Sequence, residues 1–263
     1  MRKTRRFAAC VEYDGAGFCG WQRQIGSPTV QQALEEALSK VADEPVKVVA
    51  AGRTDSGVHA CGQIVHFDSY APRSVSAWVR GANTLLPKGA ALVWALEVGD
   101  DFHARFSALE RGYRYVIFNR RIRPTWLAGR ATWHYRPLDP EPMRQAADSL
   151  LGWHDFDAYR AAACQAKSPV RELRRLDIGR QGQWLWLDVA ADGFLHHMVR
   201  NLAGVLIKIG AGLAPATWAQ EVLESRDRTR GGITAPPDGL YLTRVDYDGR
   251  FGLPEPPAPP RFW

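Results

Sequence analysis

The chain has 263 residues, of which 46% are hydrophobic, and this is enough to bury a large core and excludes a disordered protein. Its 34 Lys and Arg against 28 Asp and Glu give a net charge of +6, which favours a polyanionic partner such as nucleic acid. No window approaches the roughly 20 consecutive apolar residues of a membrane span. Four cysteines without a CxxC pair, and no signal peptide, fit a cytoplasmic protein.

The first hundred residues alternate between strand and helix patterns. Apolar side chains at every second position predict the first strand, and Thr29 with Gln32 forms a capping box that predicts the start of the first helix. The expected elements are strands at 6–14, 46–50, 63–68 and 91–98 and helices at 30–41 and 74–86. The order β-α-β-β-α-β is typical of a ferredoxin-like unit.

The second half has a similar pattern. It predicts strands at 108–119, 170–179, 183–189 and 240–247 and helices at 141–151 and 193–209. We therefore expect an α+β fold in which two ferredoxin-like halves, residues 1–105 and 106–250, join into one mostly antiparallel sheet with a central cleft. Residues 251–263 form a proline-rich tail, of which residues 253–260 are expected to be extended and poorly packed.

The segment between the second and third predicted strands is the most informative one for chemistry. Residues 51–60 place Arg53, Asp55 and His59 among glycines, which allow sharp turns and close approach of a substrate. A nearby positive charge favours an anionic carboxylate, the form that a nucleophile needs. The alternative is a turn held by a structural Arg53–Asp55 pair.

Five segments in order resemble those of the tRNA pseudouridine synthase A family. The string Gly52-Arg53-Thr54-Asp55-Ser56-Gly57-Val58-His59-Ala60 is similar to the active-site signature of that family. The other four segments are 13–31, 102–115, 194–210 and 234–240. The resemblance extends from about residue 13 to residue 247, and so covers nearly the whole chain.

The resemblance implies the pseudouridine synthase fold and the isomerisation of uridine to pseudouridine at positions 38, 39 and 40 of the anticodon stem-loop of tRNA. It implies that Asp55 is the catalytic nucleophile, at either the base or the sugar, that Arg53 and Arg200 lie nearby, with Arg200 pairing with Asp55, and that Tyr113 stacks on the target uracil. The reaction consumes no nucleotide, and the sequence has no P-loop, dinucleotide fingerprint or zinc spacing, so no cofactor and no metal are expected. A homodimer in which tRNA spans both subunits is also implied.

Several of these residues have simpler interpretations. Tyr113 alternates with Tyr115, so both side chains could face the core, and Arg200 could form a structural pair in its apolar helix. Adjacent His196 and His197 on a helix would point in directions too different to share one metal ion. His59 and His103 are expected to hydrogen-bond to backbone and orient loops.

RNA binding requires basic side chains, for which the sequence offers many candidates. We name Arg23, Arg73, Arg80, Arg105, Arg111 and Arg114. Two rival functions remain at this point, a non-catalytic RNA-binding protein and a metal-dependent nuclease. The first gives the loop around Asp55 no role, and the second normally requires a cluster of carboxylates, whereas Asp55 is the single acid in its loop.

Overall fold

The computed structural model describes residues 4–263, which fall into two compact units. The first unit runs to Leu109 and includes Tyr241–Pro260, whereas the second comprises Glu110–Leu240 and Arg261–Trp263. The predicted division near residue 105 lies close to this boundary. The predicted assignment of residues 241–250 to the second half differs from the structure, because strand β10 (Leu240–Tyr247) pairs in parallel with β3 (His59–Ser69) of the first unit.

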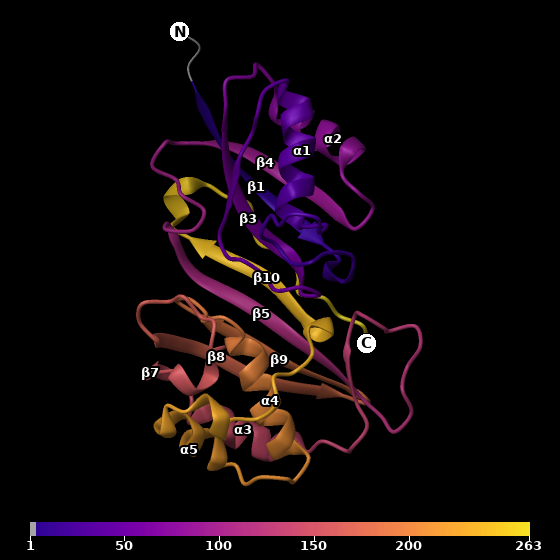
Figure 1. The fold of residues 1–263 in the computed structure, drawn as a ribbon, viewed down its shortest axis with the longest axis vertical. Coiled ribbons are helices and arrows are strands. Elements are labelled where there is room, and N and C mark those ends of the chain that lie inside the picture. The colour runs from indigo at the N-terminus through magenta and orange to yellow at the C-terminus, as the bar shows by residue number, and fades with distance from the viewer. Residues whose placement is uncertain (1–3) are drawn as a thin grey trace. The chain divides into compact units, whose positions relative to one another are not determined.

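The first unit has the predicted β-α-β-β-α-β order (Figure 1). Its remaining elements are β1 (Arg5–Tyr13), α1 (Val30–Ala42), β2 (Val48–Ala50), α2 (Val75–Leu85) and β4 (Ala90–Val98). Strand β1 lies between β4 and β3, and β2 pairs with the other edge of β3; all of these pairings are antiparallel. This is the strand order of a ferredoxin-like unit.

An aromatic cluster joins the sheet of the first unit to its helices. Phe7 and Phe67 are register partners on β1 and β3, with ring centroids 5.3 Å apart, and both contact Trp78 of α2. All three side chains are at most 1% exposed. Burial of this size stabilises the fold by about 2 to 3 kcal/mol for each large side chain, so the cluster fixes α2 on the sheet.

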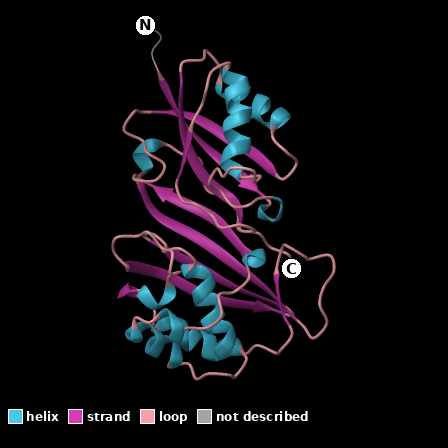
Figure 2. Cartoon of the chain, viewed as in Figure 1, coloured by secondary structure: helices cyan, strands magenta, loops and turns pink. Residues whose placement is uncertain are grey.

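The second unit also has an antiparallel sheet, in the order β5-β9-β8-β7. Its elements are β5 (Ala108–Asn119), β6 (Thr132–His134), α3 (Pro140–Asp148), β7 (Gly152–Asp155), β8 (Val170–Gln181), β9 (Trp184–Ala191), α4 (Met198–Gly210) and α5 (Trp218–Ser225). Strand β6 pairs in parallel with β5. The two units together confirm the predicted α+β class with mostly antiparallel strands (Figure 2).

Local predictions failed where the sequence signal was short or ambiguous. Strands β6 and β7 and helix α5 were not predicted, since each is brief. The capping box was wrong, because the Thr29 side chain is buried and its hydroxyl has no hydrogen-bond partner among residues 4–263. Helix α4 begins at Met198 rather than at Gly193, because His197 before it adopts a left-handed backbone with φ of 62°.

The C-terminal tail is extended, as predicted, but its end is packed. Beyond Phe251 the chain has neither helix nor strand, whereas Phe262 stacks on Trp184 and Trp263 stacks on Trp186, with centroids 5.6 and 4.2 Å apart. The two packed residues follow the stretch 253–260 for which poor packing was predicted, and their aromatic rings cover strand β9. No helix within residues 4–263 has the length and apolar character needed to cross a bilayer.

Candidate active site

The loop that carries Asp55 joins β2 to β3, is hydrogen-bonded to β3 at its start and is closed by a turn at its end. Ala51 donates its N–H to the carbonyl of Ile64 at 2.8 Å, and Val58 donates to the carbonyl of Asp55 at 3.1 Å. Gly57 has φ of 80°, a left-handed conformation that glycine adopts without strain. Because Asp55 is the predicted nucleophile, we call residues 51–58 the catalytic loop; its backbone turns back at Asp55 and is held there.

Buried polar side chains of β1 and β3 form hydrogen bonds with the catalytic loop. The hydroxyl groups of Tyr13 and Thr54 lie 2.9 Å apart, and both residues are less than 8% exposed. Gln63 is fully buried and donates to the carbonyl of Gly52 at 2.7 Å. Burial raises the pKa of Tyr13 to about 12, so its hydroxyl stays protonated and keeps this hydrogen bond at neutral pH.

A second segment, residues 18–21, lies directly against the catalytic loop. Trp21 donates its N–H to the carbonyl of Thr54 at 3.0 Å, and the Ser56 hydroxyl donates to the carbonyl of Phe18 at 3.4 Å. Gly20 has φ of 85°, and a Cβ there would lie 2.9 Å from the Thr54 carbonyl oxygen. Only glycine therefore fits here without a shift, and the residues on both sides of Asp55 are held in place.

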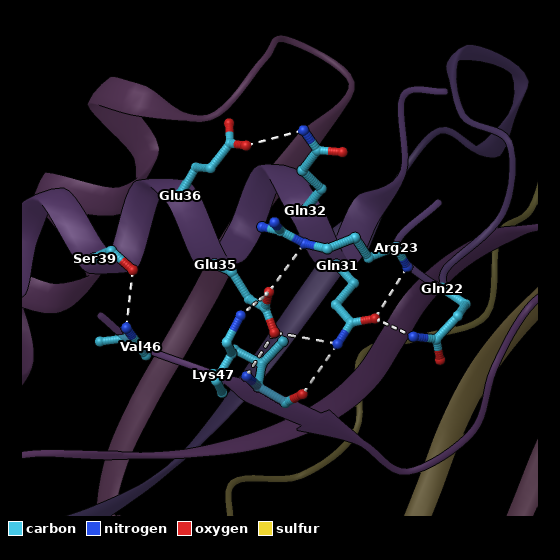
Figure 3. A network of polar contacts seen from close by, with 10 residues as sticks. Gln22, Arg23, Gln31, Gln32, Glu35, Glu36, Ser39, Val46 and Lys47 are labelled. Atoms are coloured by element: carbon cyan, nitrogen blue, oxygen red, sulfur yellow. Dashed lines mark hydrogen bonds and ion pairs between the residues drawn. The ribbon is translucent and has the colours of Figure 1, made fainter. Parts of the chain in front are cut away.

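This second segment is in turn anchored to helix α1 through a buried carboxylate (Figure 3). Glu35 is 3% exposed and accepts from the Gln31 side chain at 3.1 Å and from the Val48 N–H at 3.2 Å. Gln31 accepts at its other end from the Arg23 N–H at 3.0 Å and from the side chain of Gln22 at 2.9 Å. These hydrogen bonds run from Glu35 to Gln22 and Arg23, which directly follow the segment that touches Thr54. The N–H of Gln31 also donates to the carbonyl of Trp21 at 3.0 Å, so the segment itself is anchored to α1.

Glu35 is also neutralised by two cations. Its Oε2 lies 3.3 Å from Nε of Arg23 and 3.7 Å from Nζ of Lys47. A buried carboxylate is costly unless it is paired and hydrogen-bonded, and here both conditions hold. Sequence reasoning missed this role, because a Glu on an amphipathic helix is usually a surface residue; the only hint was the resemblance that includes Gln31.

The predicted residues of the first unit differ in exposure. Asp55 is partly exposed, whereas its neighbour Thr54 is buried. Arg53 is exposed, and its side chain forms no ion pair among residues 4–263, so the alternative of a structural Arg53–Asp55 pair is not what holds this turn. Asp55 is thus a carboxylate on a rigid backbone whose side chain is reachable from outside the core.

His59, the first residue of β3, and His103 confirm the prediction that these rings form hydrogen bonds to backbone. The Nδ1 atom of His59 accepts from the Gly15 N–H at 3.0 Å, and its ring stacks on Tyr241 at 4.5 Å. The Nδ1 atom of His103 accepts from the N–H groups of Arg105 and Phe106 at 3.2 and 3.1 Å.

In the second unit, Tyr113 and Tyr115 lie on β5 with different environments. Tyr115 is fully buried, its hydroxyl lies 2.6 Å from that of Thr132, and burial raises its pKa well above the usual range. Tyr113 is only partly buried and makes an edge-to-face contact with Phe194 at 5.1 Å. The core interpretation therefore holds for Tyr115, whereas Tyr113 keeps part of its ring accessible.

Arg200 lies in the first turn of α4 and is fastened to the segment that precedes β10. Its Nε donates to the carbonyl of Ala235 at 2.8 Å, while its own carbonyl accepts from the Ala235 N–H at 3.1 Å. This contact joins two segments of the backbone, which is a common structural role of an Arg in an apolar helix. It also fixes the direction in which the guanidinium leaves the helix.

His196 and His197 precede α4 rather than lie within it. Their rings are 4.1 Å apart, and the left-handed backbone at His197 brings the two side chains together. The argument that helix geometry separates these two rings was therefore wrong, because it assumed a helical backbone from Gly193 onward.

Comparison with known proteins identifies the class. The model of a family described as tRNA pseudouridine synthase matches residues 9–107 and 146–248, which is more than half of the chain. The chain therefore belongs to the tRNA pseudouridine synthase family.

Individual relatives sharpen this assignment. A tRNA pseudouridine synthase A of Thiobacillus denitrificans is 57% identical over 250 residues, covering 95% of this chain and 96% of the relative. Proteins of the same name from Alcanivorax borkumensis and Pseudomonas aeruginosa are each 55% identical, covering 97% and 98% of this chain and 96% and 90% of their own length. The protein is an isomerase that forms pseudouridine in tRNA, so neither the nuclease nor the non-catalytic RNA-binding protein is supported.

Proposed function

We propose that this synthase modifies uridines 38, 39 and 40 in the anticodon stem-loop of tRNA, with Asp55 as its nucleophile. The observation that carries the proposal is the catalytic loop itself: its backbone is fixed by Thr54, Gly20 and Trp21, while the carboxylate of Asp55 is partly exposed. A nucleophile must be held in position and yet reach its substrate, and this loop meets both requirements.

The reaction breaks the N1–C1′ bond of uridine, turns the base and joins its C5 to C1′, while a proton leaves C5 and N1 gains one. Asp55 attacks either C6 of the base or C1′ of the ribose, and both routes use the same carboxylate. The uridine must first leave its stack, which costs a few kcal/mol. Phosphate contacts and stacking within the enzyme offset that cost.

The other site residues have supporting roles in this proposal. Arg53, exposed beside Asp55, binds the backbone of the everted nucleotide, and Arg200 pairs with the Asp55 carboxylate. The partly accessible ring of Tyr113 stacks on the uracil. We further propose that the enzyme acts in the cytoplasm as a homodimer with tRNA across both subunits.

The decisive experiment compares Asp55→Asn with Asp43→Asn. Asp43 is an exposed carboxylate of the same unit at the end of α1, where its left-handed backbone suits Asn equally well. We expect Asp55→Asn to lower pseudouridine formation by at least about 10³-fold, with tRNA affinity within about threefold of wild type. Asp43→Asn should change neither quantity. Turnover of Asp55→Asn within tenfold of wild type would eliminate the nucleophile assignment, and mapping of pseudouridines in the product tests the positions.

Tyr113 is tested by two substitutions in the same assay. Tyr113→Ala removes the stacking ring and should lower kcat/KM by about 5- to 150-fold, since stacking of a base on an aromatic ring contributes about 1 to 3 kcal/mol. Tyr113→Phe keeps the ring and should restore most of that loss. Equal losses for both variants would show that the hydroxyl, rather than stacking, is what the reaction needs.

A further inference from the structure

A run of cationic residues in the second unit is not accounted for by the active site. Residues 120–136 contain five arginines and no aspartate or glutamate. They connect β5 to β6 and continue just past β6, and the connection is drawn as a long loop in Figure 2. We call residues 120–136 the cationic loop.

The charged and aromatic side chains of the cationic loop lie on the surface. Arg121, Arg123 and Arg136 are exposed, as are Trp126 and Tyr135, at 67% and 52%. Within residues 4–263, no carboxylate forms an ion pair with any of these three arginines. Most exposed arginines elsewhere in this unit do have such partners, as Arg144 and Arg175 show.

The backbone beneath these side chains is nevertheless anchored. Leu127 is 1% exposed, and the indole N–H of Trp133 donates to the carbonyl of Arg120 at 2.8 Å. Trp126 makes an edge-to-face contact with Trp184 of β9. The cationic loop is thus a fixed platform that presents uncompensated guanidinium groups and aromatic rings to solvent.

We propose that the cationic loop binds the phosphate backbone of tRNA outside the stem-loop that carries the target uridine. Guanidinium groups without acidic partners are complementary to phosphates, and nearby aromatic rings add stacking surface. A second copy of this chain is a poorer occupant, because a symmetric contact would place the same five arginines against one another.

The distance along β5 places this contact away from the reacting base. Tyr113 lies on β5, and Arg120 directly follows the strand. The two residues are seven positions apart, which corresponds to roughly 23 Å of extended chain. If Tyr113 stacks on the uracil, as proposed above, the cationic loop meets another part of the tRNA. The inference in this respect rests on the proposed function.

Several arginines named from the sequence are less suited to this task. Arg114 forms two hydrogen bonds with the Asp188 carboxylate at 2.8 and 2.7 Å and is 12% exposed at its side chain, and Arg111 donates to the carbonyl of Asp192. Arg23 is paired with Glu35. These three have structural roles, whereas the side chains of Arg121 and Arg123 form no hydrogen bond or ion pair within residues 4–263.

The test compares two double variants of the full-length protein that lose the same charge. Arg121→Gln with Arg123→Gln alters the cationic loop, and Arg144→Gln with Arg175→Gln removes two ion-paired arginines of the same unit. Binding of full-length tRNA and of a short hairpin with the target uridine is measured against salt concentration. We expect the loop variant to reduce the salt slope for tRNA by about 2 and its affinity by about tenfold or more, with kcat at saturating tRNA and hairpin binding unchanged.

Other results would overturn the proposal. An unchanged slope, or an equal change in the control variant, would show that the loop arginines contact no phosphates. Equal weakening for hairpin and tRNA would place the contact within the target stem-loop. A lower oligomeric mass of the loop variant in sedimentation would make the loop a subunit interface. Failure of the proposed function is separate, since it would appear in the wild-type protein as pseudouridine at other positions.

Discussion

The catalytic loop and the cationic loop each follow a strand, yet they differ in the charged groups that they present. The catalytic loop holds one carboxylate and is fastened by buried hydrogen bonds from Tyr13, Gln63 and Trp21. The cationic loop is also held, by the buried Leu127, by the indole hydrogen bond of Trp133 and by the amide of Asn119, which donates to the carbonyls of His134 and Arg136. What differs is that it carries several arginines, of which Arg121, Arg123 and Arg136 lie exposed on the surface. Making a bond requires atoms placed within a fraction of an ångström, whereas attraction between charges acts over several ångströms. One carboxylate held in place suits the first task, and several exposed guanidinium groups suit the second.

Among the substitutions that test how the two loops are held, Gly20→Ala has the largest expected effect, because it disturbs the contact that holds the catalytic loop. The new Cβ would lie 2.9 Å from the Thr54 carbonyl oxygen on a left-handed backbone, so Thr54 and Asp55 must shift. We expect the free energy of unfolding to fall by about 2 to 4 kcal/mol and kcat to fall by tenfold or more. Gly26→Ala is the matched control, since its φ is also positive, at 75°, but open space surrounds it.

This variant also sharpens the contrast between the two loops. Gly20→Ala should leave the salt dependence of tRNA binding unchanged, because it removes no charge, whereas the loop-arginine variant should leave kcat unchanged. Denaturant unfolding, single-turnover rates and binding at several salt concentrations measure all three quantities. A Gly20→Ala protein with wild-type kcat would show that the backbone around Asp55 need not be held so tightly.

A smaller effect is expected from Glu35→Gln, which weakens the anchor without touching the catalytic loop. The amide keeps an acceptor for Gln31 and Val48 but loses the charge that pairs with Arg23 and Lys47. We expect the free energy of unfolding to fall by about 1 to 2 kcal/mol and kcat by about threefold, with KM unchanged.

Glu36→Gln is the control for this anchor. Glu36 is exposed on the same helix and bonds only to Gln32 among the contacts that the structure describes (Figure 3). A fall in stability without any fall in kcat for Glu35→Gln would limit Glu35 to a structural role.

The sequence alone predicted the elements whose apolar residues form a clear local pattern. Strand 108–119 and strand 240–247 were predicted with the bounds that the structure has, because alternating apolar residues mark them clearly. The pairing of β10 with β3 could not be predicted, since register between distant strands leaves no local signal. The start of α4 was missed because a non-glycine residue, His197, adopts a left-handed backbone.

For the site, the sequence indicated the residues but not what holds them. The string around Asp55 stands out by its composition and its resemblance to a family signature. The buried carboxylate of Glu35 and the close approach of Gly20 to Thr54 depend on contacts between separate segments, which spacing does not encode. Arg121 and Arg123 stand in a run without acids, yet only their exposure and the absence of ion pairs to them within residues 4–263 distinguish them from Arg114.

The division of the chain has a practical consequence for genetic dissection. The polypeptide passes from one unit to the other after Leu109, after Leu240 and after Pro260, so neither unit corresponds to an uninterrupted stretch of gene. A fragment that stops at Leu109 lacks the strand that lies beside β3, and a fragment that starts at Glu110 carries that strand without its neighbour. Separating the units would require a permuted gene that restores residues 241–260 to the first one.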